Sequence, residues 1–249
     1  MTPVPALSVS DLSKAFGGLR AVEGVALSVA AGERRALIGP NGAGKTTLFN
    51  LISGDLSPSG GRIALFGRDV TNLPPNRRAA LGLARTYQIT NLFPSLTVLE
   101  NLLLAVQALE RTKLTLLRPI TAYPHLYTRA HAILDSVGLA DKVGEVVRNL
   151  SHGEQRQMEV ALALACRPRL LLLDEPTAGL SPAESRMMTG LLKRLDNGIT
   201  LLVIEHDMDV AFELTDRVTV LHNGKVVADG SGDEVKADPL VREIYLGSA

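Results

Sequence analysis

The sequence is poor in cysteine and has no excess of either charge. Its single cysteine cannot support a disulfide framework of the kind that small secreted domains use. Lysine plus arginine and aspartate plus glutamate both number 26, so the formal net charge is zero and no global basic field is available to attract nucleic acid. We therefore expect no nucleic-acid partner.

Long hydrophobic runs are also missing. No stretch approaches the roughly 18 apolar residues of a membrane span, and the N-terminal Met-Thr-Pro-Val-Pro lacks the basic and apolar regions of a secretory signal. We expect the chain to stay in the cytoplasm. A role in a membrane process would then require docking on other subunits that span the bilayer.

The composition is that of a globular protein, with 46% hydrophobic and 21% charged residues in a chain of 249. This length is long for one compact domain and short for two, which predicts a single core with one sizeable insertion.

Hydrophobic spacing predicts strands that alternate with helices on either side of a helical block. The predicted strands are Leu7–Val9, Val25–Val29, Arg35–Ile38, Arg62–Phe66, Leu170–Leu173, Thr200–Ile204, Val218–Leu221 and Val226–Ala228. The predicted helices are Thr47–Ser53, one from Val98, Tyr127–Val137, Glu154–Cys166, Ala183–Leu195 and Asp209–Thr215. This order indicates an α/β fold, with a mixed sheet that is largely parallel, an antiparallel β part and an inserted helical subdomain.

A phosphate-binding loop is predicted at Gly39-Pro40-Asn41-Gly42-Ala43-Gly44-Lys45-Thr46, after a strand and at the start of a helix. Its backbone N–H groups and the helix dipole favour phosphate there. Lys45 would neutralise the β- and γ-phosphates, the Thr46 hydroxyl would bind Mg²⁺, and Thr47 would donate to the α-phosphate. The expected nucleotide contacts are Asn41, Gly42, Gly44, Lys45, Thr46 and Thr47. A glycine-rich turn that carries lysine by chance is the plain alternative.

Two carboxylates, Asp174 and Glu175, follow a predicted buried strand at the end where open α/β sheets bind ligands. Asp174 would hold Mg²⁺, and Glu175 would orient and deprotonate the attacking water. A solvated turn is the structural alternative.

These two features fit many nucleotidases, including kinases, recombinases and helicases, but Leu150-Ser151-His152-Gly153-Glu154-Gln155 is more selective. Ser151 and Gly153 at a helix start make a second anion site, although Ser151 with Glu154 can also be a plain capping box. The segment resembles the signature of the ATP-binding-cassette family, in which this site closes on ATP held by another subunit.

That resemblance covers about Leu7 to Gly247 and implies a P-loop NTPase of ATP-binding-cassette type with ATP and Mg²⁺ as ligands. It implies that Gln88 contacts Mg²⁺ and the attacking water, that His206 reaches the γ-phosphate, and that Phe16 stacks on adenine. Taken singly, a glutamine, a histidine or a phenylalanine is a weak signal. Their order relative to the other motifs is what carries the implication.

The subfamily is indicated by Phe16-Gly17-Gly18-Leu19, Glu205-His206-Asp207-Met208 and Tyr245-Leu246-Gly247, which look like the ATPase subunits of branched-chain amino-acid importers. Urea or amide importers and lipopolysaccharide exporters share parts of this pattern. A soluble cassette ATPase is a further alternative, whereas a module that no longer hydrolyses ATP conflicts with the intact Lys45 and Glu175.

Two departures from the family pattern concern the contact between subunits. The usual Leu-Ser-Gly-Gly-Gln reads Leu-Ser-His-Gly-Glu, with His152 and Glu154, and Ser181 stands where many members have Asp. They leave open how the partner's phosphate is held and how two ATP sites communicate.

The resemblance also sets the expected domains and partners. One domain spans 1–249, with 1–90 and 167–249 as the catalytic core and about 91–166 as the helical and signature subdomain. The expected partners are a second ATPase subunit, identical or different, membrane permease subunits, and indirectly a substrate-binding protein. The permease subunits would dock in a groove between Gln88 and Glu100, lined by Thr90, Leu92 and Phe93. The chain would then lie on the inner face of the membrane. The transported substrate cannot be read, because this subunit contacts ATP and the permease.

Overall fold

The computed structural model describes residues 3–86, 92–108, 110 and 118–246. The chain forms two compact units: unit 1 contains Met1–Arg85, Arg169–Pro176 and Asp196–Ala249, and unit 2 contains Thr86–Pro168 and Thr177–Leu195. Residues 177–195, predicted as part of the core, therefore group with the helical unit, because α6 (Pro182–Lys193) packs against α5 (His152–Ala165).

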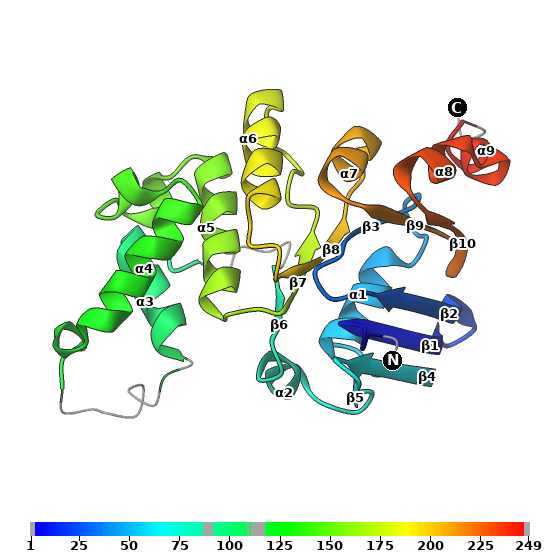
Figure 1. The fold of residues 1–249 in the computed structure, drawn as a ribbon, viewed down its shortest axis with the longest axis horizontal. Helices are drawn as coiled ribbons and strands as arrows, with labels where there is room; N and C mark the ends of the chain where they lie inside the picture. Colours follow the sequence, from blue (N-terminus) through cyan, green and yellow to red (C-terminus); the bar gives the residue numbers. More distant parts are fainter. Residues whose placement is uncertain (1–2, 87–91, 109, 111–117, 247–249) are drawn as a thin grey trace. The chain divides into compact units, whose positions relative to one another are not determined.

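Unit 1 contains a mixed sheet, with the described strands in the order β10-β9-β3-β8-β7-β6 (Figure 1). These strands are β3 (Arg34–Ile38), β6 (Leu83–Arg85), β7 (Leu170–Asp174), β8 (Thr200–Ile204), β9 (Arg217–His222) and β10 (Lys225–Gly230). All neighbours are parallel except the β9–β10 hairpin. Every residue of β3, β7 and β8 is buried, as expected of parallel strands covered on both faces. The mixed sheet is thus confirmed.

A second sheet in unit 1 is antiparallel, with the described strands in the order β2-β1-β4-β5. Its strands are β1 (Leu7–Phe16), β2 (Leu19–Val29), β4 (Gly60–Leu65) and β5 (Arg68–Asp69). The predicted strands were too short for β1 and β2, because β1 shifts register between Val9 and Leu12 and then resumes pairing with β2. A bulge of this kind breaks the alternation that a sequence pattern relies on.

The helices of unit 1 begin with α1, which follows β3 and contributes Leu48, Phe49, Leu51 and Ile52 to a core cluster shared with both sheets. The helices are α1 (Lys45–Ser53), α2 (Pro75–Ala79), α7 (Met208–Leu214), α8 (Gly232–Ala237) and α9 (Pro239–Leu246). Sequence periodicity missed α2, α8 and α9, and α2 and α8, with five and six residues, carry too little periodic signal.

Unit 2 is helical, and α3, α4 and α5 pack against one another (Figure 1). Its α-helices are α3 (Val98–Ala108), α4 (Pro124–Ser136), α5 and α6, and its short 3₁₀ turns are η2 (Ile120–Ala122), η3 (Ala140–Lys142) and η4 (Val147–Asn149). The start predicted at Tyr127 was wrong. Helix α4 begins at Pro124, because proline fits the first helical turn, where its missing N–H has no partner to lose.

No helix in the described part of the chain combines the length and apolarity needed to cross a bilayer.

Candidate nucleotide site

The loop between β3 and α1 is closely packed on one side and open on the other. A Cβ on Gly39 would lie 2.1 Å from the carbonyl oxygen of Leu221, and one on Gly44 would lie 2.3 Å from that of Ala21. Gly42 has a φ of +80°, yet a Cβ there would meet nothing within 4 Å. The loop therefore rests on the hairpin and on β2 while leaving a free concavity at Gly42, which suits a phosphate cradle.

Lys45 is turned into this loop. Its side chain is buried, and Nζ donates to the carbonyl oxygens of Gly39 at 2.6 Å and Pro40 at 3.0 Å. Burial lowers the pKa of Lys45, and the negative charges of Glu175 and Asp174 oppose that shift. An anionic phosphate oxygen is a stronger acceptor than either carbonyl, so the ammonium is well placed to exchange them for phosphate.

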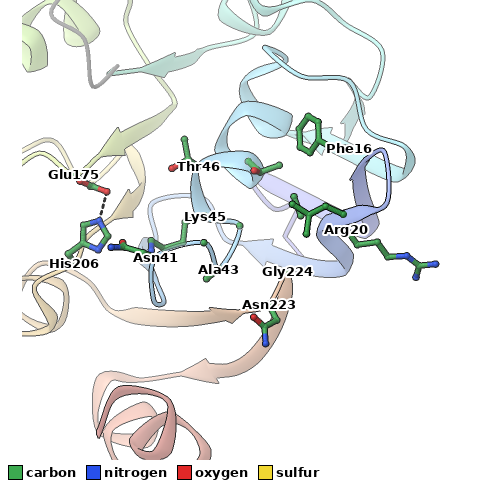
Figure 2. A pocket seen from close by; sticks show the side chains of 15 residues that line it. Phe16, Arg20, Asn41, Ala43, Lys45, Thr46, Glu175, His206, Asn223 and Gly224 are labelled. Atoms are coloured by element: carbon green, nitrogen blue, oxygen red, sulfur yellow. Dashed lines mark hydrogen bonds and ion pairs between the residues drawn. The ribbon is translucent and has the colours of Figure 1, made fainter. Parts of the chain in front are cut away.

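A pocket of about 620 Å³ opens beside the loop in unit 1 (Figure 2). Its lining residues are Phe16, Leu19, Arg20, Ala21, Asn41, Gly42, Ala43, Gly44, Lys45, Thr46, Thr47, Glu175, His206, Asn223 and Gly224. The structure thus brings together all predicted site residues of unit 1 except Asp174, which does not line this pocket.

Phe16 lies at one end of the pocket, at the end of β1, with 47% of its surface exposed. The Lys14 ammonium sits 5.2 Å from the centroid of its ring and also donates to the carbonyl oxygen of Ser57 at 2.8 Å. The ring is therefore supported by a cation and remains open to a planar aromatic group.

Glu175 and His206 meet in the same pocket, with Glu175 Oε1 and His206 Nε2 2.5 Å apart (Figure 2). They follow β7 and β8, neighbouring parallel strands, so their side chains emerge at the same sheet edge. Glu175 has a φ of 51°, and its N–H donates to the carbonyl oxygen of Ile204 at 3.0 Å. A left-handed conformation in a residue other than glycine is strained, and such strain often occurs at functional sites.

Asp174 is 3% exposed at the end of β7, and burial raises the pKa of its carboxyl, while the hydrogen bond from Arg85 opposes that rise. Arg85 Nη2 lies 3.0 Å from Asp174 Oδ2. Together with the Thr46 hydroxyl, this carboxylate provides oxygen donors, the type that Mg²⁺ prefers. Among the described residues, no group of three His, Cys, Asp or Glu side chains could hold a metal by itself. Mg²⁺ is usually held by one or two protein oxygen ligands and completes its shell with phosphates and water, and Asp174 and Thr46 fit such an ion.

The hairpin turn between β9 and β10 contributes a wall of the pocket that the motifs did not reveal. Asn223 and Gly224 have φ values of 47° and 78°, the pair that a two-residue primed turn requires. Gly224 N–H donates to the carbonyl oxygen of Ala43 at 2.9 Å, which fastens the turn to the phosphate loop. An Asn-Gly dipeptide between two strands is typical of such a turn, but nothing in the sequence placed it beside the loop.

The predicted second anion site lies in unit 2, at the start of α5. Ser151 is the N-cap: its Oγ accepts from Glu154 N–H at 3.2 Å, and the Glu154 carboxylate accepts from Ser151 N–H at 2.8 Å. The capping-box interpretation is thus confirmed, and Ser151 remains exposed.

A second carboxylate of unit 2 lies against the same helix start. A Cβ on Gly153 would be 2.8 Å from Glu184 Oε1. Hydrogen bonds from Ser181, and more weakly from the Gly153 N–H, hold the pKa of Glu184 below its usual value. His152 Nε2 lies 3.2 Å from the position of a Cβ on Gly179, which places this unusual residue beside the loop before α6. The chain's own groups thus already occupy part of the predicted anion site.

The remaining predictions fall partly outside the described residues. Gln88 and Thr90 lie outside the described residues. Phe93, predicted to face a permease, is described and is 55% exposed. Its backbone N–H donates to Asn101 Oδ1 at 2.9 Å, and Asn101 Nδ2 donates back to the Phe93 carbonyl oxygen at 3.0 Å, so a buried amide fixes the backbone of this exposed residue.

Two family profiles match the sequence: one described as ABC transporter over residues 22–178, and one described as branched-chain amino acid ATP-binding cassette transporter over residues 225–249. The chain is 40% identical to the high-affinity branched-chain amino acid transport ATP-binding protein LivG of Salmonella typhimurium, over 98% of this chain and 99% of LivG. It is 38% identical to BraF of Pseudomonas aeruginosa, a protein of the same description, over 98% and 99% of the two chains.

Solved structures of ATP-binding cassettes are also similar to this chain. The ADP conformation of MJ1267, an ATP-binding cassette of an ABC transporter, matches with a TM-score of 0.86 and 32% identity over 98% of this chain and 99% of that one. A dimeric post-hydrolysis state of the ATP-binding cassette MJ0796 bound to ADP and Pi matches with a TM-score of 0.77 and 27% identity over 90% and 98%.

Proposed function

Because this chain belongs to the ABC transporter family of ATP-binding cassettes, we propose that it is the ATP-hydrolysing subunit of an importer for branched-chain amino acids. The proposal rests on one observation above all. The phosphate loop with Lys45 and the Glu175–His206 pair, 2.5 Å apart, line a single pocket. Binding and hydrolysis of a nucleoside triphosphate require both features in one place.

ATP would lie along this pocket from Phe16 to Glu175. The adenine would stack on the exposed Phe16 ring, and the phosphates would enter the concavity at Gly42. Lys45 would exchange its two backbone carbonyl acceptors for oxygens of the β- and γ-phosphates, and Asn41, Gly44 and Thr47 would supply the other loop contacts.

Hydrolysis would use the residues at the sheet edge. Glu175 accepts the proton of the attacking water, and His206, already in contact with it, orients that carboxylate and reaches the γ-phosphate. Thr46, Asp174 and Gln88 would hold Mg²⁺, which neutralises phosphate charge when it is bound.

The helix start in unit 2 supports a two-subunit arrangement. In the described part of the chain the pocket at Lys45 has the features of a triphosphate site, and Ser151 and Gly153 offer hydrogen-bond donors at a second helix N-terminus. We assign them to ATP held by a second ATPase subunit, identical or different, in a head-to-tail pair. A dimeric state known for a related cassette is compatible with this arrangement.

Membrane attachment would come from permease subunits, placing the chain on the inner face of the cell membrane. The exposed Phe93, between Gln88 and Glu100, is our candidate for that contact. A photoreactive residue at position 93 should crosslink to a permease in membranes. Crosslinks that form only from a distant control such as Met187, which is equally exposed at 59%, would place the contact elsewhere.

The catalytic test is Glu175→Gln, which keeps the shape of the side chain but removes the base. We expect ATP affinity to change little, turnover to fall by at least ~10²-fold, and ATP-bound dimers to accumulate, measured by phosphate release and light scattering. Turnover near the wild-type rate would refute the role of Glu175.

The substrate assignment needs a separate test in the host cell. Deleting the gene should abolish high-affinity uptake of radiolabelled leucine, isoleucine or valine, and the wild-type gene, but not the Glu175→Gln variant, should restore it. Loss of urea uptake, or of lipopolysaccharide delivery, with intact amino-acid uptake would identify an alternative member of the family.

A further inference from the structure

Arg85, the last residue of β6, is a buried side chain that no motif singled out. Only 6% of its side-chain surface is exposed. Its Nη2 lies 3.0 Å from Asp174 Oδ2, and its Nη1 donates to Asn50 Oδ1 at 2.6 Å, to Ser53 Oγ at 3.0 Å and to Asp55 Oδ2 at 3.1 Å. One guanidinium therefore ties the end of β7 to the end of α1.

The contacts of Arg85 with β7 and with α1 both affect the proposed metal ligands, Asp174 and Thr46. Helix α1 carries Thr46 in its first turn and Asn50 and Ser53 in its last turns, so fixing its far end also limits how its first turn can shift. Arg85 holds the Asp174 carboxylate at Oδ2. Arg85 also lies 5.7 Å from the centroid of Phe49, a buried ring on α1. A planar guanidinium with several fixed partners constrains geometry far more than a flexible ammonium does.

A second buried arginine reaches the same end of α1 without touching the site. Arg78, 1% exposed, donates to the carbonyl oxygens of Leu51 at 2.6 Å and Ile52 at 2.7 Å, and also to those of Leu73 and Thr71. These four acceptors are backbone carbonyls, so Arg78 anchors α1 but orients no carboxylate. The two arginines differ in what they hold, and this difference separates positioning of Asp174 from support of the fold.

We propose that Arg85 is a positioning residue for the Mg²⁺ site, fixing the Asp174 carboxylate relative to the first turn of α1. The inference rests on the proposed ATPase function and extends it to a residue that does not line the nucleotide pocket. Partners that orient a metal ligand typically change metal affinity by 10- to 100-fold when replaced. Loosening Arg85 should accordingly raise the metal concentration that the ATP-bound protein requires.

The decisive variant is Arg85→Lys, because lysine keeps the positive charge but lacks the planar guanidinium that contacts several partners at once. Mn²⁺ is titrated, as a stand-in for Mg²⁺, into the full chain with a non-hydrolysable ATP analogue, and bound metal is followed by electron paramagnetic resonance. We expect the midpoint to rise about 10-fold, while nucleotide affinity in EDTA stays within about 2-fold of wild type. An unchanged midpoint would overturn the proposal.

Arg78→Lys is the matched control, measured in the same way together with unfolding by urea. It should lower stability and leave the metal midpoint unchanged. Equal shifts of the midpoint in both variants would reduce Arg85 to a general support of α1 and refute the proposal.

Asp55→Asn provides a milder second variant if Arg85→Lys does not fold. Asp55 lies two residues after α1 and is partly exposed at 32%, so its replacement weakens one contact of Arg85 without altering Asp174. We expect a rise of the midpoint of about 2- to 3-fold, below that of a directly contacting partner, and no rise would count against the proposal. Failure of the proposed function looks different, because wild-type protein would then bind no nucleotide in EDTA and release no phosphate with Mg²⁺.

Discussion

The two helix starts that are expected to meet phosphate, one in each unit, differ in what already satisfies their polar groups. At α1, Lys45 is held by two neutral backbone carbonyls, and the concavity at Gly42 is free. At α5, the Ser151 N–H is held by the carboxylate of Glu154, and the carboxylate of Glu184 lies against Gly153.

This difference means that phosphate can bind directly at the start of α1, whereas at the start of α5 it meets the negative charge of two carboxylates. An incoming phosphate at α1 replaces neutral acceptors with a stronger, anionic one. At α5 the helix dipole still favours an anion, but two carboxylates of the chain already benefit from it. We therefore expect the α1 site to bind nucleotide in the isolated subunit and the α5 site to contribute only when a partner brings ATP.

The largest effect should come from Lys45→Ala, which removes the only charged group of the loop. Hydrogen bonds to charged groups contribute about 1.5–3 kcal/mol each, so nucleotide affinity should fall by roughly 10- to 100-fold in calorimetric titration. The isolated subunit should lose nucleotide affinity to the same extent as the dimer of two ATPase subunits. Retained affinity would remove the contrast between the two helix starts.

A smaller effect is expected from Ser151→Ala, which acts on the α5 side. Loss of an N-cap costs about 1 kcal/mol of stability, and ATP-dependent dimerisation should weaken by about 10-fold, as for one lost hydrogen bond to a charged group. Nucleotide binding by the isolated subunit should not change.

Ser231→Ala is the control for this change, because Ser231 forms the same capping box with Glu234 at the start of α8. It should cost similar stability, measured by urea unfolding, and leave dimerisation intact. If both variants weakened the dimer alike, Ser151 would be a cap and nothing more.

The smallest effect should come from Glu184→Gln, and its sign is the informative part. Glutamine can still cap α6, but it no longer places a negative charge beside Gly153. ATP-dependent dimers should become tighter by roughly 2- to 5-fold, in the range of a single exposed charge interaction, as judged by analytical ultracentrifugation. Glu234→Gln, the same change in α8, should have no effect, and a weaker dimer from Glu184→Gln would contradict the idea that this carboxylate opposes phosphate.

Much of the site was predictable because its motifs are local. The run from Gly39 to Thr46 contains its own strand-to-helix transition, and Asp174-Glu175 follows a short run of leucines that is typical of a buried strand. The same locality explains the failures. Helix α2 and strand β6 are too short for any periodicity, and α6 has the pattern of any surface helix, so its grouping with α5 left no mark on the sequence.

The sequence by itself determined the fold class, the phosphate loop, the acidic strand end and the capped start of α5, since each depends on neighbours a few residues apart. Only the tertiary structure decided that Asn223 and Gly224 close the pocket, that Glu184 lies against Gly153, and that Arg85 joins Asp174 to α1. Those contacts link residues 31 to 181 positions apart, as with Gly153 and Glu184 or Ala43 and Gly224. Packing of separate elements brings such residues together, and no local spacing encodes it.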